Sequence, residues 1–337
     1  MQKQLPVRPI IVRVTTISLA LEKLLTGQMR FMQEHGFDVY MISSDSDNTT
    51  DLAKREKSKF IPVRMTRVIS PISDLVSLIS LVKVFLKLKP QIVHSHTPKA
   101  GLLSMMAAKI AGVPVRLHTV AGLPLMEATG IKRKILDIVE RITYWCATGV
   151  YPNSINLKNY ILQNNYCNSK KLKVIGNGSS NGINSNYYAP NDDIIAQAKK
   201  IKNKYKILDE QFVFIFIGRV VPDKGIVELV HAFTKLKKHY SQIRLLIVGP
   251  FESDLYQMPE EILNTIKTDH SIIHTGYQED VRPYLASSHV LTFPSYREGL
   301  PNVPMQAGCF NLPAIVTNIN GCNEIIENGV NGLSLAP

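Results

Sequence analysis

The sequence predicts an α/β protein built from two doubly wound domains, each with a parallel sheet covered by helices on both faces. First, 337 residues are enough for two domains that each bury a core. Second, short apolar runs alternate with segments of helical length along the chain, among them "IIVRVTT", "QIVHSH", "FVFIFIG" and "IRLLIVG". Fully apolar strands that alternate with helices are typical of parallel sheets buried on both sides.

A third observation divides the chain. The stretch "IGNGSSNGINSNYYAPND" is dense in Gly, Asn and Ser, which are turn-forming residues. It predicts an N-terminal domain at 1–176, a linker at 177–192 and a C-terminal domain at 193–337. We expect the domains to face each other across a cleft at the carboxyl ends of their strands, where open α/β sheets bind ligands.

The cysteines and the N-terminus indicate a cytoplasmic protein. None of the four cysteines forms a C-x-x-C pair or a metal-ligand spacing, which predicts reduced thiols and no metal site. The N-terminus lacks a cationic stretch that leads into a long apolar run, so we expect no secretory signal.

The net charge of +12 is concentrated in the first half of the chain. Residues 1–176 contain 25 Lys and Arg against 11 Asp and Glu, whereas the remainder contains 14 and 16. Such a field attracts an anionic partner, for which we expect a membrane surface. A basic surface without a dedicated partner is the alternative. Nucleic acid is not expected, because no recognisable binding module accompanies the charge.

Two helices in this basic half are candidates for contact with a membrane. The first, at 72–89, carries too many polar residues to cross a bilayer, and we expect it to be buried over most of its circumference. The second, at 131–147, has one apolar stripe that we expect to face the core, with its basic residues in solvent. The stripe comprises Ile131, Ile135, Ile138, Val139, Ile142 and Trp145.

Two cations follow a strand in "FIFIGRVVPDKGIVELVHAF". The strand ends at Gly218, the loop carries Arg219 and Lys224, and Gly225 opens a helix. A guanidinium fork, an ammonium group and the N–H groups of a helix terminus together suit a bound diphosphate. The alternative is that both cations are solvated loop charges.

A second strand-to-helix turn is encoded by "PSYREGLPNVPMQAG". Glu298 stands on the turn, Gly299 allows close approach to the backbone, and a helix begins near Asn302. An ionised carboxylate accepts hydrogen bonds from sugar hydroxyls, so Glu298 is a candidate sugar ligand.

These motifs, together with "INGCNEIIENGVNG", resemble the C-terminal domain of retaining nucleotide-sugar glycosyltransferases of the GT-B fold, family four. "PQIVHSHTPKAGLLSMMAAKIAGVPVRLHT" and "NGSSNGIN" resemble the N-terminal domain and the linker of that family. The resemblance covers nearly the whole chain and is strongest to bacterial capsule, O-antigen and lipid-linked oligosaccharide transferases.

The resemblance implies roles for individual residues. Arg219 and Lys224 match the pair that binds the donor diphosphate, and Glu298 matches the first glutamate of the E-x7-E motif, which contacts the transferred sugar. Tyr277 falls where the family has its nucleobase pocket. The backbone that lines the sugar and phosphates is implied at Gly218, Gly299, Leu300, Asn302 and Val303.

The sequence departs from the family pattern at several points. The second glutamate of the motif, which holds the ribose hydroxyls, is Gln306, and we expect ribose binding to be weakened or reorganised. Ala121 stands where family members have an acceptor-side histidine; His118, three residues earlier, either substitutes as a catalytic residue or is a satisfied histidine within a strand. The glycine-rich loop expected after the first strand is "TTISLALEKLLTG", and the C-terminal end is shorter than the family pattern, so the second domain is expected to be incomplete.

The resemblance implies transfer of a hexose or N-acetylhexosamine, with retention, from a nucleoside-diphosphate sugar, with UDP as the expected nucleotide. No metal and no cofactor are implied. The expected acceptor is an undecaprenyl-diphosphate-linked glycan at the inner face of the cytoplasmic membrane, where the chain is peripheral, in surface-polysaccharide biosynthesis.

Three alternatives remain at this point. Asp45 and Asp47 have the D-x-D spacing of metal-dependent transferases of the other major fold. A nucleotide-sugar 2-epimerase shares the fold but requires more acid and base groups around the sugar than Glu298. A catalytically silent nucleotide-sugar-binding subunit is favoured by Gln306, Ala121 and the short C-terminus.

Overall fold

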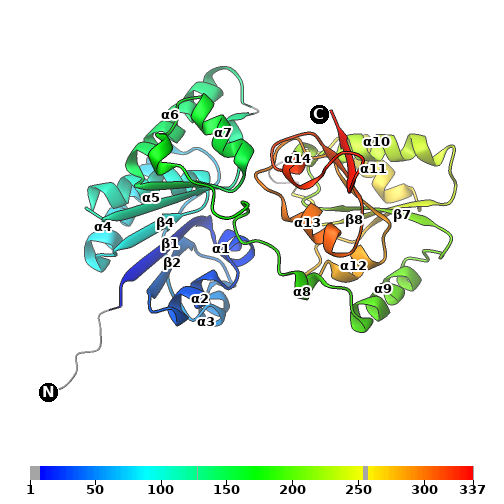
Figure 1. Cartoon of the computed structure of the whole chain (residues 1–337), viewed down its shortest axis with the longest axis horizontal. Coiled ribbons are helices and arrows are strands. Elements are labelled where there is room, and N and C mark those ends of the chain that lie inside the picture. The colour runs from blue at the N-terminus through cyan, green and yellow to red at the C-terminus, as the bar shows by residue number, and fades with distance from the viewer. Residues whose placement is uncertain (1–7, 127, 253–256, 337) are drawn as a thin grey trace. The chain divides into compact units, whose positions relative to one another are not determined.

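The computed structural model describes residues 8–126, 128–252 and 257–336, and it contains two compact units. Unit one is Met1–Asn181 and unit two is Gly182–Pro337. The division falls inside the segment 177–192 that the sequence marks as a linker. Figure 1 shows the helices and strands of both units.

Unit one has a six-stranded sheet in which every neighbouring pair of strands is parallel, in the order β3-β2-β1-β4-β5-β6. Parallel neighbours require a crossover, and helices supply it each time. The central strands carry near-continuous apolar runs because both faces of the sheet are covered. The strands are β1 (Ile10–Ile17), β2 (Asp38–Ser44), β3 (Lys59–Pro62), β4 (Ile92–Ser95), β5 (Val115–Val120) and β6 (Gly149–Pro152).

Helices cover both faces of this sheet. One core, which includes Leu21, Met29 and Leu52, packs under α1 (Ser18–Leu24), α2 (Gln28–Glu34) and α3 (Thr49–Arg55). The other core lies under α4 (Pro71–Leu88), α5 (Pro98–Ile110), α6 (Gly130–Cys146) and α7 (Ile155–Gln163). Figure 1 shows α4, α5 and α6 on one face of the sheet and α2 and α3 on the other. Among the described helices, none combines the length and the apolar character needed to span a bilayer.

Two expectations about the helices of unit one hold only in part. In α4, Ser77, Leu81 and Phe85 are buried and four half-buried residues pack against the core, whereas the opposite side is exposed; the four are Leu78, Val82, Val84 and Leu88. In α6, Ile142 packs against the core, but most of the predicted stripe faces outward: Ile131 is 78% exposed and Trp145 is 67% exposed. The buried residues of α6 are Glu140, Thr143, Tyr144 and Cys146.

Unit two repeats the architecture with the strand order β12-β11-β10-β7-β8-β9, again with parallel neighbours throughout. The strands are β7 (Phe212–Ile217), β8 (Ile243–Val248), β9 (Ile272–His274), β10 (Val290–Phe293), β11 (Ala314–Thr317) and β12 (Gly332–Leu335). One face carries α10 (Ile226–Lys237) and α11 (Glu260–Thr268). The other carries α9 (Asp192–Lys204), α12 (Arg282–Ala286), α13 (Asn302–Cys309) and α14 (Cys322–Ile325), while α8 (Ser185–Tyr188) contacts α13.

A glycine sets the distance between α5 and the sheet of unit one. A Cβ atom at Gly101 would lie 2.4 Å from Cε1 of His118, whose ring is buried in β5. Since the ring is enclosed and hydrogen-bonded to Ser95, it has little room to move. The close packing of α5 on β5 therefore requires glycine at this position.

We expect Gly101→Ala to destabilise the protein by about 1–3 kcal/mol, because overpacking outweighs the better helix propensity of alanine. Gly308→Ala is the matched control: it also lies in a helix, and a Cβ atom there meets nothing within 4 Å. We expect the control to be neutral or slightly stabilising. Urea unfolding of both variants measures the difference, and equal stabilities would contradict the packing described here.

Candidate functional site

The carboxyl edge of the second sheet gathers the charged residues that the sequence singles out. Strands β7, β8, β9 and β10 are neighbours and parallel, so the segments that follow them begin at one edge. Arg219 follows β7, Glu252 follows β8, Tyr277 follows β9 and Glu298 follows β10. This edge is where open α/β sheets bind ligands.

An ion pair joins two of these segments. The Nζ atom of Lys224 lies 2.5 Å from Oε1 of Glu298, and the two side chains are only 16% and 14% exposed. The backbones approach closely as well: the N–H of Tyr296 donates to the carbonyl of Asp223 at 3.1 Å. Gly225 has φ of +70°, and a Cβ atom there would lie 2.0 Å from the carbonyl oxygen of Pro294. The site therefore places an ammonium group and a carboxylate side by side.

The turn that carries Glu298 is held from behind by Asn320. The side-chain amide of Asn320 donates to the carbonyls of Glu298 and Gly299, at 2.9 and 2.8 Å. Gly321 then packs against the same turn, where a Cβ atom would lie 1.9 Å from the carbonyl oxygen of Gly299. Helix α13 begins at Asn302, so the N–H groups of its first turn lie at this edge. Sequence reasoning missed Asn320, although it lies within the quoted "INGCNEIIENGVNG".

Arg219 is paired differently from the expectation that it acts beside Lys224. Its NH1 atom lies 2.7 Å from Oε2 of Glu252, an acidic residue that sequence reasoning also missed. The two loops run together, because the N–H of Val220 donates to the carbonyl of Pro250 at 2.8 Å. A guanidinium has five N–H donors in a planar fork, a geometry that matches a carboxylate or a phosphate group.

Gln306 already has a partner within unit two. Its Nε2 atom donates to the hydroxyl of Tyr188 in α8 at 2.7 Å. Burial raises the pKa of the Tyr188 hydroxyl, which keeps it protonated. The amide oxygen of Gln306 is thus the group suited to a ligand hydroxyl. The remaining predicted binding residues lie on the same edge: Leu300, Asn302 and Val303 are half-buried, and Tyr277 is 56% exposed.

Cys322 lies beneath the Lys224–Glu298 pair. Burial raises the pKa of its thiol to about 12, and the negative charge of Glu298 acts in the same direction. The thiol is fully buried and stays protonated, so Cys322 is a packing residue and no nucleophile.

An apolar cavity of about 370 Å³ lies elsewhere in unit two, between α10 and strands β10 and β11. Among the described residues that line it, Glu228 alone is charged, and its carboxylate would repel a diphosphate. We therefore place the candidate site at the carboxyl edge, where the cations are.

His118 lies in the core of unit one. It is 3% exposed, and its Nδ1 atom lies 2.8 Å from Oγ of Ser95. Burial lowers the pKa of the ring to about 4, so it is neutral near pH 7. The geometry favours a satisfied histidine within a strand, which is the second of the two interpretations that the sequence leaves open. Ala121 follows β5 and supplies no titratable group.

Sequence reasoning missed a second buried polar cluster in unit one, formed by Arg13, His94 and His96. Arg13 of β1 donates to Nδ1 of His94 at 3.0 Å, which leaves the opposite ring nitrogen to donate to Thr119 at 2.8 Å. The next histidine, His96, is 4% exposed and neither of its ring nitrogens has a partner. Burial lowers the pKa of both histidines well below the usual value. The sequence signal is "HSH", in which His94 belongs to β4 and His96 directly follows its last residue, Ser95.

The D-x-D pair has a local structural explanation. The carboxylate of Asp45 accepts from the hydroxyl of Thr49 at 2.6 Å and from the N–H of Ser46 at 3.0 Å, in the turn before α3. Within residues 8–126, 128–252 and 257–336, no group of three or more His, Cys, Asp or Glu residues could hold a metal ion.

The ion pair makes a prediction for stability. We expect Lys224→Met and Glu298→Gln each to lower the free energy of unfolding by about 1–3 kcal/mol, because each leaves a mostly buried charge without its partner. The double variant should lose less than the sum, with a coupling energy of about 1–3 kcal/mol from urea unfolding.

The control cycle uses the exposed pair Lys59 and Asp38, which lies at 3.2 Å with side chains 61% and 30% exposed. Its coupling should stay below about 1 kcal/mol. Additive losses at Lys224 and Glu298 would show that the two side chains are not coupled.

Both units resemble known proteins in sequence. Residues 197–337 match the family described as glycosyl transferases group 1, and residues 17–154 match the family described as glycosyl transferase 4-like. The capsular polysaccharide biosynthesis glycosyltransferase CapM of Staphylococcus aureus is 33% identical over 96% of this chain and 82% of its own length. The UDP-Gal:alpha-D-GlcNAc-diphosphoundecaprenol alpha-1,3-galactosyltransferase of Escherichia coli is 31% identical over 95% of this chain and 82% of its own.

Solved structures share the fold. Anabaena Alr3699/HepE, solved in complex with UDP, superposes with a TM-score of 0.75 at 17% identity, over 98% of this chain and 86% of that one. WaaG, a glycosyltransferase involved in lipopolysaccharide biosynthesis, gives a TM-score of 0.73 at 13% identity, over 97% and 86%. The similarity to CapM, 33% identity, extends over nearly the full length of the chain. Together with the family matches and the shared fold, it shows that the chain is a glycosyltransferase of the GT-B fold and belongs to the group 1, glycosyltransferase 4-like family.

Proposed function

We propose that this glycosyltransferase moves a hexose or N-acetylhexosamine, with retention of anomeric configuration, from a nucleoside-diphosphate sugar to a lipid-diphosphate-linked glycan. UDP is the expected nucleotide. The observation that carries the proposal is the Lys224–Glu298 pair at the carboxyl edge of the second sheet. The printed activity of the Escherichia coli relative, with a UDP-sugar donor and a diphosphoundecaprenol acceptor, supports the substrate classes.

Donor binding follows from the charges at the edge. Lys224 offers an ammonium group, Arg219 offers a guanidinium fork, and the start of α13 directs backbone N–H groups to the diphosphate. When the ammonium turns to a phosphate oxygen, the carboxylate of Glu298 becomes available to accept hydrogen bonds from sugar hydroxyls. These same cations stabilise the negative charge that grows on the diphosphate as the glycosidic bond breaks.

In the transfer step, the acceptor hydroxyl oxygen bonds to the anomeric carbon on the face from which the diphosphate leaves. The bond from that carbon to the phosphate oxygen breaks, and the hydroxyl proton passes to the leaving diphosphate. The products are the nucleoside diphosphate and the lengthened glycan. No side chain is needed as the base, which is in keeping with the buried position of His118.

The proposal includes no metal ion and no cofactor. We also propose that the chain works in surface-polysaccharide biosynthesis at the inner face of the cytoplasmic membrane, where a lipid-diphosphate acceptor is presented. The biosynthetic role printed for the Staphylococcus aureus relative supports this assignment.

We expect Glu298→Gln to lower kcat by about 10²–10³-fold, because the lost carboxylate holds the sugar while charge develops on the diphosphate. The assay follows sugar transfer from UDP-sugars to an undecaprenyl-diphosphate-linked acceptor, in the presence of EDTA. The exposed Glu327→Gln serves as the control and should keep its activity. Loss of all activity with EDTA would contradict metal independence, and epimer formation from donor alone would favour the 2-epimerase.

We expect Gln306→Ala to weaken UDP binding about 3–10-fold, the equivalent of one hydrogen bond, in isothermal titration. Affinity for inorganic diphosphate should be unchanged, because only UDP carries the ribose. Tyr188→Phe removes the partner of Gln306 but keeps the amide, so it controls for indirect effects. Unchanged UDP affinity in Gln306→Ala would show that this residue does not hold the ribose.

A catalytically silent nucleotide-sugar-binding subunit is the second candidate. The contacts of Arg219 with Glu252 and of Gln306 with Tyr188 favour it, since each engages a proposed ligand of the donor. UDP binding by the wild-type chain without any sugar transfer would decide for this alternative.

A further inference from the structure

Helix α4 is apolar on both of its sides. Ser77, Leu81 and Phe85 point into the core of unit one. The opposite side presents Ile72, Leu75, Val76, Ile79 and Leu86, of which Ile72 is 83% exposed. These five follow helical spacing, so they form one continuous stripe on the exposed side. A folded protein gains nothing in solution from exposing such a stripe.

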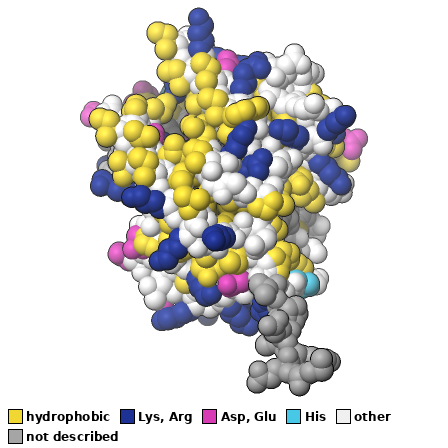
Figure 2. Space-filling view, turned by 90° about the vertical axis from the view of Figure 1, so that its left-hand side faces the viewer, with side chains coloured by type: hydrophobic (Ala, Val, Ile, Leu, Met, Phe, Trp, Pro, Cys, Tyr) yellow, Lys and Arg dark blue, Asp and Glu magenta, His cyan; other side chains and the backbone are white. Residues whose placement is uncertain are grey.

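Helix α6 presents a second stripe of the same kind. Ile131, Ile135, Ile138 and Trp145 are exposed, opposite the buried side that carries Glu140 and Tyr144. Helix α5 contacts both α4 and α6, and its last residue, Ile110, is 63% exposed. Figure 2 views this side of unit one, where hydrophobic side chains form a band bordered by Lys and Arg.

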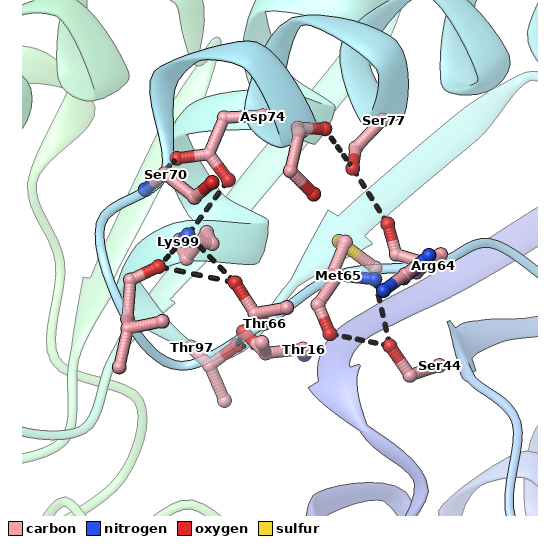
Figure 3. Close-up of polar contacts among 12 residues, drawn as sticks. Thr16, Ser44, Arg64, Met65, Thr66, Ser70, Asp74, Ser77, Thr97 and Lys99 are labelled. Atoms are coloured by element: carbon pink, nitrogen blue, oxygen red, sulfur yellow. Dashed lines mark hydrogen bonds and ion pairs between the residues drawn. The ribbon is translucent and has the colours of Figure 1, made fainter.

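The segment that leads into α4 is firmly held, although its apolar side chains are exposed. Lys99 binds Asp74 at 2.6 Å and also donates to the carbonyl of Val68, and Ser44 exchanges two hydrogen bonds with Met65 (Figure 3). The hydroxyl of Ser77 donates to the carbonyl of Arg64 at 2.5 Å. Val68 and Ile69 are 60% and 64% exposed on this braced segment.

The charge around the stripes is strongly positive. Residues 64–146 contain 12 Lys and Arg against 4 Asp and Glu. Lys83 lies within the exposed stripe of α4, Lys134 and Arg141 border that of α6, and Lys109 lies over the ring of Trp145. Exposed apolar and aromatic side chains among cations match the interface of an anionic bilayer. There the apolar and aromatic side chains insert between the lipids, and the cations contact the anionic headgroups.

We propose that the exposed sides of α4 and α6, together with Val68, Ile69 and Ile110, form a surface that docks unit one on an anionic lipid bilayer. This patch is called the docking surface below. Its use in bringing the enzyme to a lipid-linked acceptor rests on the proposed function, but binding to lipid does not. Lys99 and Asp74 hold the segment that carries Val68 and Ile69 at the start of α4.

The docking surface contains its own reporter, because Trp145 is the only tryptophan of the chain. We expect its emission to shift to the blue, and its quenching by iodide to fall, when the full chain meets vesicles with 30% phosphatidylglycerol in phosphatidylcholine. Pure phosphatidylcholine vesicles should bind at least tenfold more weakly. Raising the salt to 0.5 M should weaken binding without abolishing it, because the inserted side chains are not screened. An unchanged Trp145 spectrum on anionic vesicles would overturn the proposal.

Vesicle co-sedimentation of variants separates the contribution of the apolar side chains to lipid binding from that of the cations. Ile72→Ser/Ile131→Ser should lower the affinity for anionic vesicles at least tenfold, whereas Ile175→Ser/Val330→Ser, at residues 61% and 73% exposed elsewhere, should change it less than twofold. Lys132→Glu/Lys134→Glu should lower it at least tenfold. Lys199→Glu/Lys200→Glu on α9 makes the same change in net charge and should have a small effect.

Two further outcomes bear on the proposal. Equal losses of vesicle affinity in the docking-surface variants and in their controls would overturn it. The proposal would also fail if analytical ultracentrifugation showed a dimer that Ile72→Ser/Ile131→Ser dissociates. Transfer to a short-chain, water-soluble acceptor distinguishes the failures. If the chain transfers sugar to this acceptor but does not bind vesicles, the docking surface is wrong and the proposed function stands. If it binds vesicles but transfers no sugar, only the proposed function is refuted.

Discussion

The ion pair between Lys224 and Glu298 is the interaction on which the candidate site depends. It joins the loop after β7 to the turn after β10, across 74 residues of sequence. Both side chains are mostly buried, so each charge needs the other. The surrounding residues maintain this pairing: Gly225 allows the two backbones to touch, and Asn320 fixes the turn of Glu298 from behind. In the proposed donor complex, a phosphate oxygen and a sugar hydroxyl replace the contact between the two charges, which are already held at the edge of the sheet.

Much of the fold follows from the sequence, because buried parallel strands are encoded locally. Apolar runs such as "FVFIFIG" and "IRLLIVG" have one structural solution when helices separate them. The positions of Lys224 and Glu298 could be predicted for the same reason, since each follows such a run. Their direct contact, and the partners Glu252 and Asn320, could not. Those contacts connect residues 21 to 74 positions apart, and no local pattern encodes them.

Helix α6 shows where periodicity fails. Its apolar stripe is real, but periodicity does not tell which side of a helix meets the sheet. The buried side contains Glu140 and Thr143, and burial raises the pKa of the Glu140 carboxyl to about 7. A charged residue inside and isoleucines outside reverse the usual pattern. The same reversal, read from the structure, is the reason why we propose a docking surface on α4 and α6.

The close approach of Gly321 to the carbonyl of Gly299 has a consequence for directed evolution of donor preference. No side chain fits at position 321 or at Gly225 without moving the backbone that carries Glu298. Random libraries that include these positions will consist mostly of misfolded members. Diversity belongs instead at Tyr277, whose side chain is 56% exposed, and at the half-buried Leu300, where a new side chain does not meet this backbone contact.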